Sequence, residues 1–331
     1  MKTPQFWYSG QKPPVWTTLL IPFAKLYNSM ARLHREYAKP QPVSVPVICL
    51  GNLVAGGSGK TPTAISLIKL LREHMIFLSP TFVTRGYKGK VIGPERVDDS
   101  NNAVFWGDEA LLLAKTAPTY VSANRYEGAE AAISSGADAI ILDDGLQNYD
   151  LQKTISFGVV DGRMGFGNQH VIPLGPLRQN LEDGIESVDG FIMIGDDQQN
   201  FMSKVPTGTP IFRAQMIVQK NIDLPHTPYI GFCGIGFPDK FKSTLHDLKI
   251  NCVGFHAFAD HHAYTMHDLS KLVNEALDKK ARLLTTEKDF VRLPEFAKKS
   301  LIDVLPIEII FDDPESILDF IRTRLTTSAM P

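Results

Sequence analysis

A glycine-rich turn between a strand pattern and a helix pattern constrains this chain more than any other feature. The apolar run 45–50 is typical of a buried strand, and residues 61–73 carry apolar side chains at helical spacing. Between them stands Gly56-Gly57-Ser58-Gly59-Lys60-Thr61, followed by Pro62 in the first turn of the expected helix. Strand, glycine loop and helix in this order predict a P-loop, and they disfavour a chance glycine turn that ends in Lys-Thr.

A loop of this kind binds phosphate. Glycines let backbone N–H groups curl round phosphate oxygens, and the helix N-terminus adds partial positive charge. Lys60 is then placed to reach the β- and γ-phosphates, and the Thr61 hydroxyl to ligate Mg²⁺. One departure is Val54, where the strict motif has Gly. The residues expected to bind the nucleotide are Gly56, Gly57, Ser58, Gly59, Lys60, Thr61 and Pro62.

A second part of the phosphate site follows another apolar run. Residues 139–142 lead directly into Asp143-Asp144-Gly145. P-loop proteins bring a carboxylate to the metal at the end of such a strand. An acidic exit turn is the alternative, since Asp and Gly favour turns. We expect Thr61, Asp143 and Asp144 as metal ligands, and the sequence leaves open which aspartate touches the metal first.

Strand and helix patterns alternate through the rest of the chain, which implies a parallel sheet covered on both faces. The predicted fold class is therefore α/β: a P-loop NTPase-type, mostly parallel sheet flanked by helices, with a second, smaller α/β domain and an N-terminal amphipathic helix. A stretch rich in Pro, Gln and Asn, 198–228, is expected to connect the domains, and 304–311 to be the last strand of the second. The expected parts are a helical segment 1–40, a P-loop domain 41–216, a smaller domain 225–312 and a helix 314–331 that returns to the P-loop domain.

The segment 1–40 is basic and rich in aromatic residues. Its charged residues are Lys2, Lys12, Lys25, Arg32, Arg35 and Lys39, with Glu36 as the single acid. From Leu19 onward apolar residues recur at helical spacing, but the run is too short and Lys25 too central for a transmembrane span. A basic, aromatic amphipathic helix suits the plane of a membrane surface. We therefore expect membrane contact here, with packing on its own domain as the alternative.

Composition excludes some classes of function. The formal net charge is −2, so the chain as a whole shows no sign of a nucleic-acid partner, and none is expected. The three cysteines, Cys49, Cys233 and Cys252, are scattered without the spacing of a metal site. They are typical of buried thiols in a reducing compartment. The N-terminus shows no cleavable signal peptide.

Several further stretches, in order along most of the chain, resemble the tetraacyldisaccharide 4′-kinase family. They are Gly51-Asn52-Leu53 with the P-loop, Thr84-Arg85-Gly86-Tyr87, Gly107-Asp108-Glu109, Asn124-Arg125, Asp143-Asp144-Gly145-Leu146-Gln147, 173–178, Asp260-His261-His262 and Thr286-Glu287-Lys288-Asp289. The resemblance implies transfer of the γ-phosphoryl group of ATP, with Mg²⁺, to the 4′-hydroxyl of a tetraacyldisaccharide 1-phosphate, forming lipid IVA in lipid A biosynthesis. It also implies a peripheral or monotopic enzyme on the cytoplasmic face of a bacterial inner membrane. Thr84 and Gln179 are small departures, where Ser and Glu are more usual.

The resemblance also assigns roles to residues. By position alone Asp108 is an acid that opens a helix; the family's matching residue is the proposed general base, supported by a His that would be His261. Lys60 is the third catalytic candidate. Arginine forks suit phosphate oxygens, although any single Arg is often a surface ion pair. The expected substrate contacts are Arg85, Arg125, Arg178, Glu109 and Gln147.

Two other kinds of protein fit the sequence less well. A P-loop GTPase needs a guanine-reading [NT]KxD motif, whereas Thr286-Glu287-Lys288-Asp289 has Lys directly before Asp. A membrane-associated module that binds nucleotide without chemistry would not need Lys60, Thr61 and the paired aspartates together. ATP consumption that depends on a lipid acceptor distinguishes an enzyme from such a module.

Overall fold

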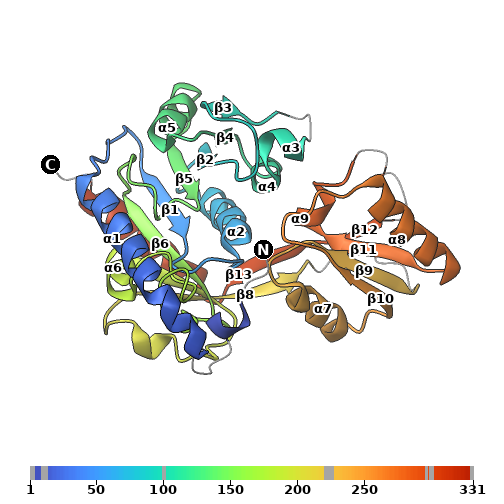
Figure 1. Cartoon of the computed structure of the whole chain (residues 1–331). Coiled ribbons are helices and arrows are strands. Elements are labelled where there is room, and N and C mark those ends of the chain that lie inside the picture. Colours follow the sequence, from blue (N-terminus) through green and yellow to red (C-terminus); the bar gives the residue numbers. More distant parts are fainter. Residues whose placement is uncertain are drawn as a thin grey trace.

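The computed structural model describes residues 4–8, 14–98, 102–219, 227–294, 297 and 302–328. The chain forms two lobes, a larger one around a nine-stranded sheet and a smaller one around a four-stranded sheet (Figure 1). Strands β8 (Ile211–Val218) and β13 (Ile307–Phe311) lie together at the edge of the larger sheet and lead toward the smaller lobe.

The larger sheet has the order β13-β8-β7-β6-β1-β5-β2-β4-β3. Its strand pairs are parallel except β3–β4 and β8–β13. The register pairs Leu50 with Asp143, so the end of β5 lies beside the start of the P-loop. The remaining bounds are β1 (Val47–Gly51), β2 (Pro80–Thr84), β3 (Glu95–Arg96), β4 (Thr119–Val121), β5 (Ala139–Asp143), β6 (Ile155–Asp161) and β7 (Gly190–Ile194).

Helices bury both faces of this sheet. On one face α2 (Lys60–Glu73) and α11 (Pro314–Ser328) pack against the side chains of β1 and its neighbours. On the other, α5 (Arg125–Ser134) and α6 (Leu181–Glu186) close a second core. A parallel sheet covered on both faces confirms the predicted fold class. The C-terminal helix packs on the larger lobe through Ile317, Leu318 and Ile321; residues 329–331 of its predicted range lie outside the described residues.

The smaller lobe is a parallel sheet of order β10-β9-β11-β12 with its own core. Its strands are β9 (Tyr229–Cys233), β10 (Cys252–Ala257), β11 (Arg282–Thr286) and β12 (Ile302–Leu305). Its helices are α7 (Pro238–Asp247), α8 (Met266–Asp278) and α9 (Glu287–Phe290). The larger lobe adds α3 (Ala103–Trp106) and α4 (Asp108–Ala114), and α4 packs against α9.

The structure corrects the sequence prediction at the connections between the lobes. The expected single strand 304–311 is two strands, because the chain leaves the smaller sheet after Leu305 and joins the larger sheet at Ile307. Residues 307–311, predicted within the smaller domain 225–312, therefore belong to the larger sheet. The expected connection 198–228 contains β8, which pairs with β7 and β13. Residues 220–226 of that connection lie outside the described residues.

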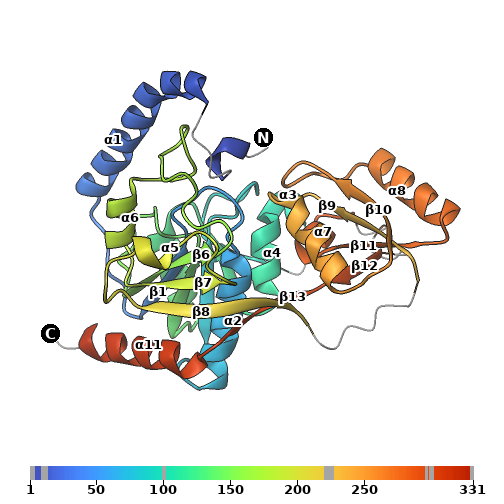
Figure 2. The same ribbon diagram turned by 90° about the horizontal axis from the view of Figure 1, so that it is seen from below.

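The N-terminal helix α1 (Ile21–Tyr37) lies along the outside of the larger lobe, on the side opposite α11 (Figure 2). It follows the short 3₁₀ turns η1 (Gln5–Trp7) and η2 (Val15–Leu20). Its polar side attaches it: Arg32 and Arg35 pair with Asp183 at 3.5 and 3.0 Å, and the Asn180 N–H donates to the side-chain oxygen of Asn28.

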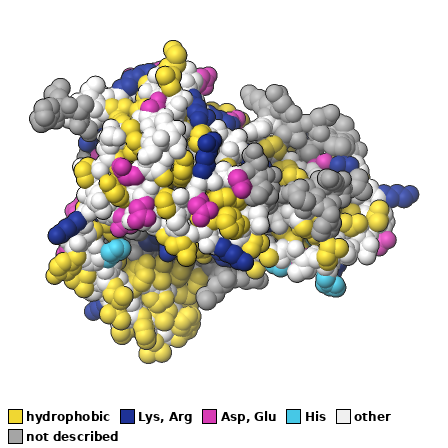
Figure 3. Space-filling view, turned by 90° about the horizontal axis from the view of Figure 1, so that it is seen from above, with side chains coloured by type: hydrophobic (Ala, Val, Ile, Leu, Met, Phe, Trp, Pro, Cys, Tyr) yellow, Lys and Arg dark blue, Asp and Glu magenta, His cyan; other side chains and the backbone are white. Residues whose placement is uncertain are grey.

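The apolar side of α1 and η2 faces outward instead. Its exposed side chains gather at one end of the molecule (Figure 3): Val15, Trp16, Leu19, Ile21, Phe23, Leu26, Tyr27, Met30 and Leu33. Phe23, for example, is 62% exposed, so packing on the protein's own core does not account for this apolar stripe. Among the described residues, the helices are all too short or too polar to cross a membrane.

Candidate active site

The P-loop is held in shape by its own side chains. Asn52, just after β1, donates to the Ser58 hydroxyl at 3.0 Å and to the Gly56 carbonyl at 3.3 Å. Gly59 has φ +86° directly before α2, and a Cβ there would lie 2.7 Å from the Ile194 side chain. Only glycine fits this conformation and this space, so Gly59 is what lets the loop turn directly into α2.

Two acids at the end of β5 meet the P-loop, and each has a different partner. The Thr61 hydroxyl donates to Asp143 Oδ2 at 2.8 Å, whereas Lys60 Nζ lies 3.6 Å from Asp144 Oδ2. Asp143 is only 1% exposed, and its other oxygen, Oδ1, is buried and has no hydrogen-bond partner among the described residues. A buried carboxylate oxygen without a partner is costly, and a divalent cation would satisfy it.

Their surroundings separate the pKa values of the two aspartates. Burial, together with the negative charges of Glu109 and Asp144, raises the pKa of Asp143 to about 7. Burial would also raise the pKa of Asp144, but the cations Lys60 and Arg178 outweigh it and hold that pKa below its usual value. Asp144 is thus already paired with two cations, Lys60 and Arg178, whereas Asp143 forms no ion pair with any residue that the structure describes.

Arg178 completes the far side of this cluster. Its guanidinium donates to both oxygens of Asp144, at 3.1 and 3.3 Å, and to the side-chain oxygen of Gln147 at 3.0 Å. Gln147 in turn donates to the Asn52 carbonyl at 3.2 Å. The structure therefore brings two predicted substrate contacts, Arg178 and Gln147, to the rim of the P-loop.

Asp108 and His261 meet across the two lobes. Asp108 opens α4 and is 3% exposed, and His261 Nδ1 lies 2.7 Å from its Oδ2. Glycine is required just before it, because Gly107 has φ +87° and a Cβ there would come within 2.7 Å of the Tyr87 carbonyl oxygen. The Tyr87 ring packs edge-on against His261. The predicted pair is thus in hydrogen-bond contact.

Cations and a hydrogen bond keep Asp108 ionised. Burial would raise its pKa, but the bond from His261 and the charges of Lys288 and Arg292 outweigh that effect and lower it. Lys288 Nζ lies 3.0 Å from Glu109 Oε1 and 3.3 Å from His261 Nε2. Since Lys288 can only donate, His261 accepts at Nε2 and donates its Nδ1–H to Asp108.

The other predicted residues have distinct surroundings. Arg85 is exposed and, among the described residues, forms no hydrogen bond or ion pair. Arg125 is buried and donates to the Ser122 and Ala123 carbonyls at 3.0 and 2.9 Å, so substrate contact by Arg125 stays a prediction beside an evident structural use. His262 is turned away and bonds Asp268 at the start of α8.

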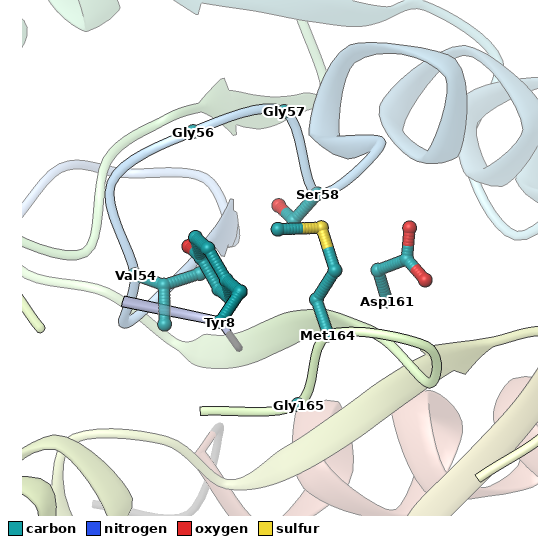
Figure 4. Close-up of a pocket in the computed structure, with 8 residues that line it drawn as sticks. All are labelled: Tyr8, Val54, Gly56, Gly57, Ser58, Asp161, Met164 and Gly165. Atoms are coloured by element: carbon teal, nitrogen blue, oxygen red, sulfur yellow. The ribbon is translucent and has the colours of Figure 1, made fainter. Parts of the chain in front are cut away.

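The sequence did not indicate that residues from distant segments of the chain lie beside the P-loop. A pocket beside the loop is lined by Tyr8, Met164 and Asp161 (Figure 4). Lys240, from α7 of the smaller lobe, ion-pairs with Asp161 and lies 3.4 Å from the Gly57 carbonyl. Asp161 could have been noticed as an acid that ends an apolar strand. Nothing in the local sequence links Lys240 or Tyr8 to the loop.

Comparison with known proteins identifies the family. The tetraacyldisaccharide-1-P 4′-kinase family matches residues 16–326. The chain belongs to this family. The sequence-based prediction of a tetraacyldisaccharide 4′-kinase is thereby confirmed, and the chain is a kinase.

Individual relatives extend over nearly the whole kinase. The tetraacyldisaccharide 4′-kinase of Rhodospirillum rubrum is 39% identical, with all of both chains covered. That of Gluconacetobacter diazotrophicus is 40% identical over 96% of this chain and 98% of its own. A solved structure of LpxK from Aquifex aeolicus in complex with ATP has a TM-score of 0.75 at 25% identity, and covers 94% of this chain and 99% of that one.

Proposed function

We propose that this kinase transfers the γ-phosphoryl group of ATP to the 4′-hydroxyl of a tetraacyldisaccharide 1-phosphate, giving lipid IVA and ADP, with Asp108 as general base. The observation that carries the proposal is that the two clusters adjoin. Helix α4, which begins at Asp108, packs against α2, which begins at Lys60 of the P-loop. In keeping with this, the charge of Glu109 contributes to the raised pKa of Asp143, which bonds Thr61. A hydroxyl near Asp108 would thus face a nucleotide on the P-loop.

The chemistry follows from this arrangement. The 4′-oxygen bonds to the γ-phosphorus, the bond from that phosphorus to the β,γ-bridging oxygen breaks, and the hydroxyl proton passes to Asp108. A carboxylate of low pKa is a weak base, but it is ionised at neutral pH, and kinases use an aspartate in this role. His261 orients Asp108 through its Nδ1–H, and the charges of Lys288 and Arg292 keep the carboxylate ionised.

Cations around the P-loop suit the phosphates. Lys60 would bind the β- and γ-phosphates of ATP, and Arg178, held by Asp144 and Gln147, would lie at the rim of the site near the transferring group. Arg85 is exposed and has no protein partner among the described residues, which leaves it available to a substrate phosphate. Pairing of Arg85 with the lipid 1-phosphate is our preferred assignment.

Mg²⁺ fits the Asp143 side of the site. The unpaired, buried Asp143 Oδ1 and the Thr61 hydroxyl supply the hard oxygen ligands that Mg²⁺ prefers. Asp144 is already ion-paired with Lys60 and Arg178. We therefore assign direct contact with Mg²⁺ to Asp143, and contact through a bound water to Asp144. When bound, Mg²⁺ neutralises charge on the phosphates.

An assay with the lipid acceptor tests the function. The protein is incubated with ATP, Mg²⁺ and a tetraacyldisaccharide 1-phosphate in detergent, and the lipid is analysed by mass spectrometry. We expect the lipid to gain one phosphoryl group, with ADP formed in equal amount. EDTA should stop the reaction. ADP formation without a change in lipid mass would contradict the proposal, as would a phosphoryl group located elsewhere than on the 4′-oxygen.

The outward apolar stripe of η2 and α1 is the proposed membrane contact, on the cytoplasmic face of the bacterial inner membrane. The exposed aromatic and aliphatic side chains, with Lys25 and Arg32 on the same helix, match a helix that lies in an anionic interface. Such placement would bring an acylated substrate to the enzyme without extracting it from the bilayer.

Replacing Phe23, Leu26 and Met30 together by Glu should release the protein from anionic liposomes in flotation. All three are exposed, so folding should be unaffected. We expect the KM for lipid to rise while the KM for ATP stays constant. The control is Leu277→Glu, which places a single glutamate on a leucine of α8 that is as exposed as Leu26. Salt should weaken wild-type binding, because each Lys or Arg beside an anionic surface contributes about 1 kcal/mol that ions screen. Unchanged flotation of the triple variant would rule out this surface.

A further inference from the structure

The segment that follows β11 holds a fully buried acid whose role is not explained by the proposed chemistry. Asp289 is 0% exposed and accepts hydrogen bonds from four groups. They are the Gly234 N–H at 2.7 Å, the Tyr264 hydroxyl at 2.6 Å, the Thr286 hydroxyl at 2.6 Å and the Arg292 guanidinium at 2.8 Å. An anion so well satisfied is rigid, and it fixes the guanidinium that it holds.

Arg292 extends from this anchor to the loop that carries His261. Its side chain is 7% exposed. One terminal nitrogen donates to the Gly234 carbonyl at 3.0 Å and the other lies 3.4 Å from the His262 carbonyl. The Gly234 carbonyl also accepts from the His261 N–H at 2.9 Å. The guanidinium therefore braces the backbone on both sides of His261, whose φ of +57° is unusual for a residue other than glycine.

The same guanidinium also faces the other lobe. Its Nε lies 3.4 Å from Asp108 Oδ2, the oxygen that His261 Nδ1 contacts, and donates to the Lys288 carbonyl at 2.9 Å. If Arg292 stabilised only the smaller lobe, its ion pair with Asp289 would be sufficient. Contact with a 3%-exposed carboxylate of the larger lobe makes Arg292 part of the junction.

We propose that Arg292, fixed by Asp289, is a positioning residue that sets the geometry of the Asp108–His261 pair across the two lobes. The inference rests on the proposed role of Asp108. The guanidinium contacts both the backbone around His261 and the carboxylate of Asp108, which His261 orients. Loss of Arg292 should therefore misplace the pair rather than remove a group that touches substrate.

The charges around Asp108 give this proposal a signature in pH. His261, Lys288 and Arg292 face the carboxylate from the smaller lobe, with the acids Glu109 and Asp260 nearby. The cations and the His261 bond outweigh burial and lower the pKa of Asp108. Removing one cation raises that pKa, and a base must be ionised to act. The acidic limb of the kcat/KM profile should then move to higher pH, which a merely structural loss would not do.

The test compares Arg292→Gln, which removes the charge, with Arg292→Lys, which keeps it. We expect kcat to fall by roughly 10²-fold for Arg292→Gln, as for small misplacements of catalytic groups, with little change in the KM for ATP. Arg292→Lys should recover part of the rate and shift the acidic limb less. The control is Arg282→Met, which breaks an ion pair with Asp303 at the start of β11, away from Asp108.

Asp108→Asn, measured alongside, separates the two proposals. If Asp108→Asn keeps nearly full activity, the proposed base is wrong. If Asp108→Asn is inactive but Arg292→Gln lowers the rate equally at every pH, or not at all, the positioning role fails while the base stands. If Arg292→Gln does not fold, Arg292→Lys decides: a wild-type rate with an unmoved limb rejects the proposal, and a reduced rate with a shifted limb supports it.

Discussion

Replacing Lys60 with alanine is expected to lower kcat by roughly 10²-fold or more, because one fixed cation on the phosphates is lost from a site shielded from water. Lys60 opens α2 and already lies against Asn52 Oδ1 at 3.3 Å and Asp144 Oδ2 at 3.6 Å. Its amine is thus held where the phosphates of a nucleotide would lie. Single-turnover transfer to the lipid acceptor measures the loss directly.

A matched control lies on the same helix. Lys69 of α2 is half exposed and pairs with Glu308 at 3.0 Å, so Lys69→Ala should leave kcat close to that of the wild type. Thermal unfolding should show that both variants fold. If folded Lys60→Ala kept more than about a tenth of the wild-type kcat, the assignment of this loop to the nucleotide phosphates would have to be abandoned.

Asp108 and His261 are expected to behave as one unit. Asp108→Ala should lower the rate by roughly 10²–10⁴-fold, the usual contribution of a general base, and His261→Ala by less, because the imidazole only orients and tunes the carboxylate. The double variant should be little worse than Asp108→Ala alone, since residues that act together are not additive. Steady-state rates of the four proteins complete the cycle.

The pH profile supplies an independent check of this pair. The pKa of Asp108 is lowered in the folded protein, so the base stays ionised and activity is lost only as pH falls through that lowered pKa. His261→Ala removes the hydrogen bond, raises the pKa of Asp108 and moves the acidic limb to higher pH. His262→Ala is the control, because His262 bonds Asp268 instead. Single losses that multiply, together with a limb that does not move, would show that the two residues act separately.

Elements whose signals are local were predicted well. Strands β9 and β11 are short apolar runs, and α8 combines apolar residues at helical spacing with a capping Thr265, so each is specified within a few residues of the chain. The P-loop belongs to the same class: strand, glycines, Lys60 and Thr61 are contiguous, and the phosphate chemistry follows from their order. The Asp108–His261 pair is different. Its members are 153 positions apart, and the family resemblance, rather than spacing, joined them.

Local sequence determined the kinds of element in this protein and one phosphate-binding loop, because hydrogen bonds within a turn and the period of apolar residues act over a few positions. The tertiary structure alone decided which distant residues contact one another. In the folded protein β13 belongs to the larger sheet, and the apolar side of α1 faces away from the core. Arg125 is buried and donates to backbone carbonyls, and Arg292 lies beside Asp108. These are contacts between residues far apart in the chain, and their energies exist only once the two sheets have formed.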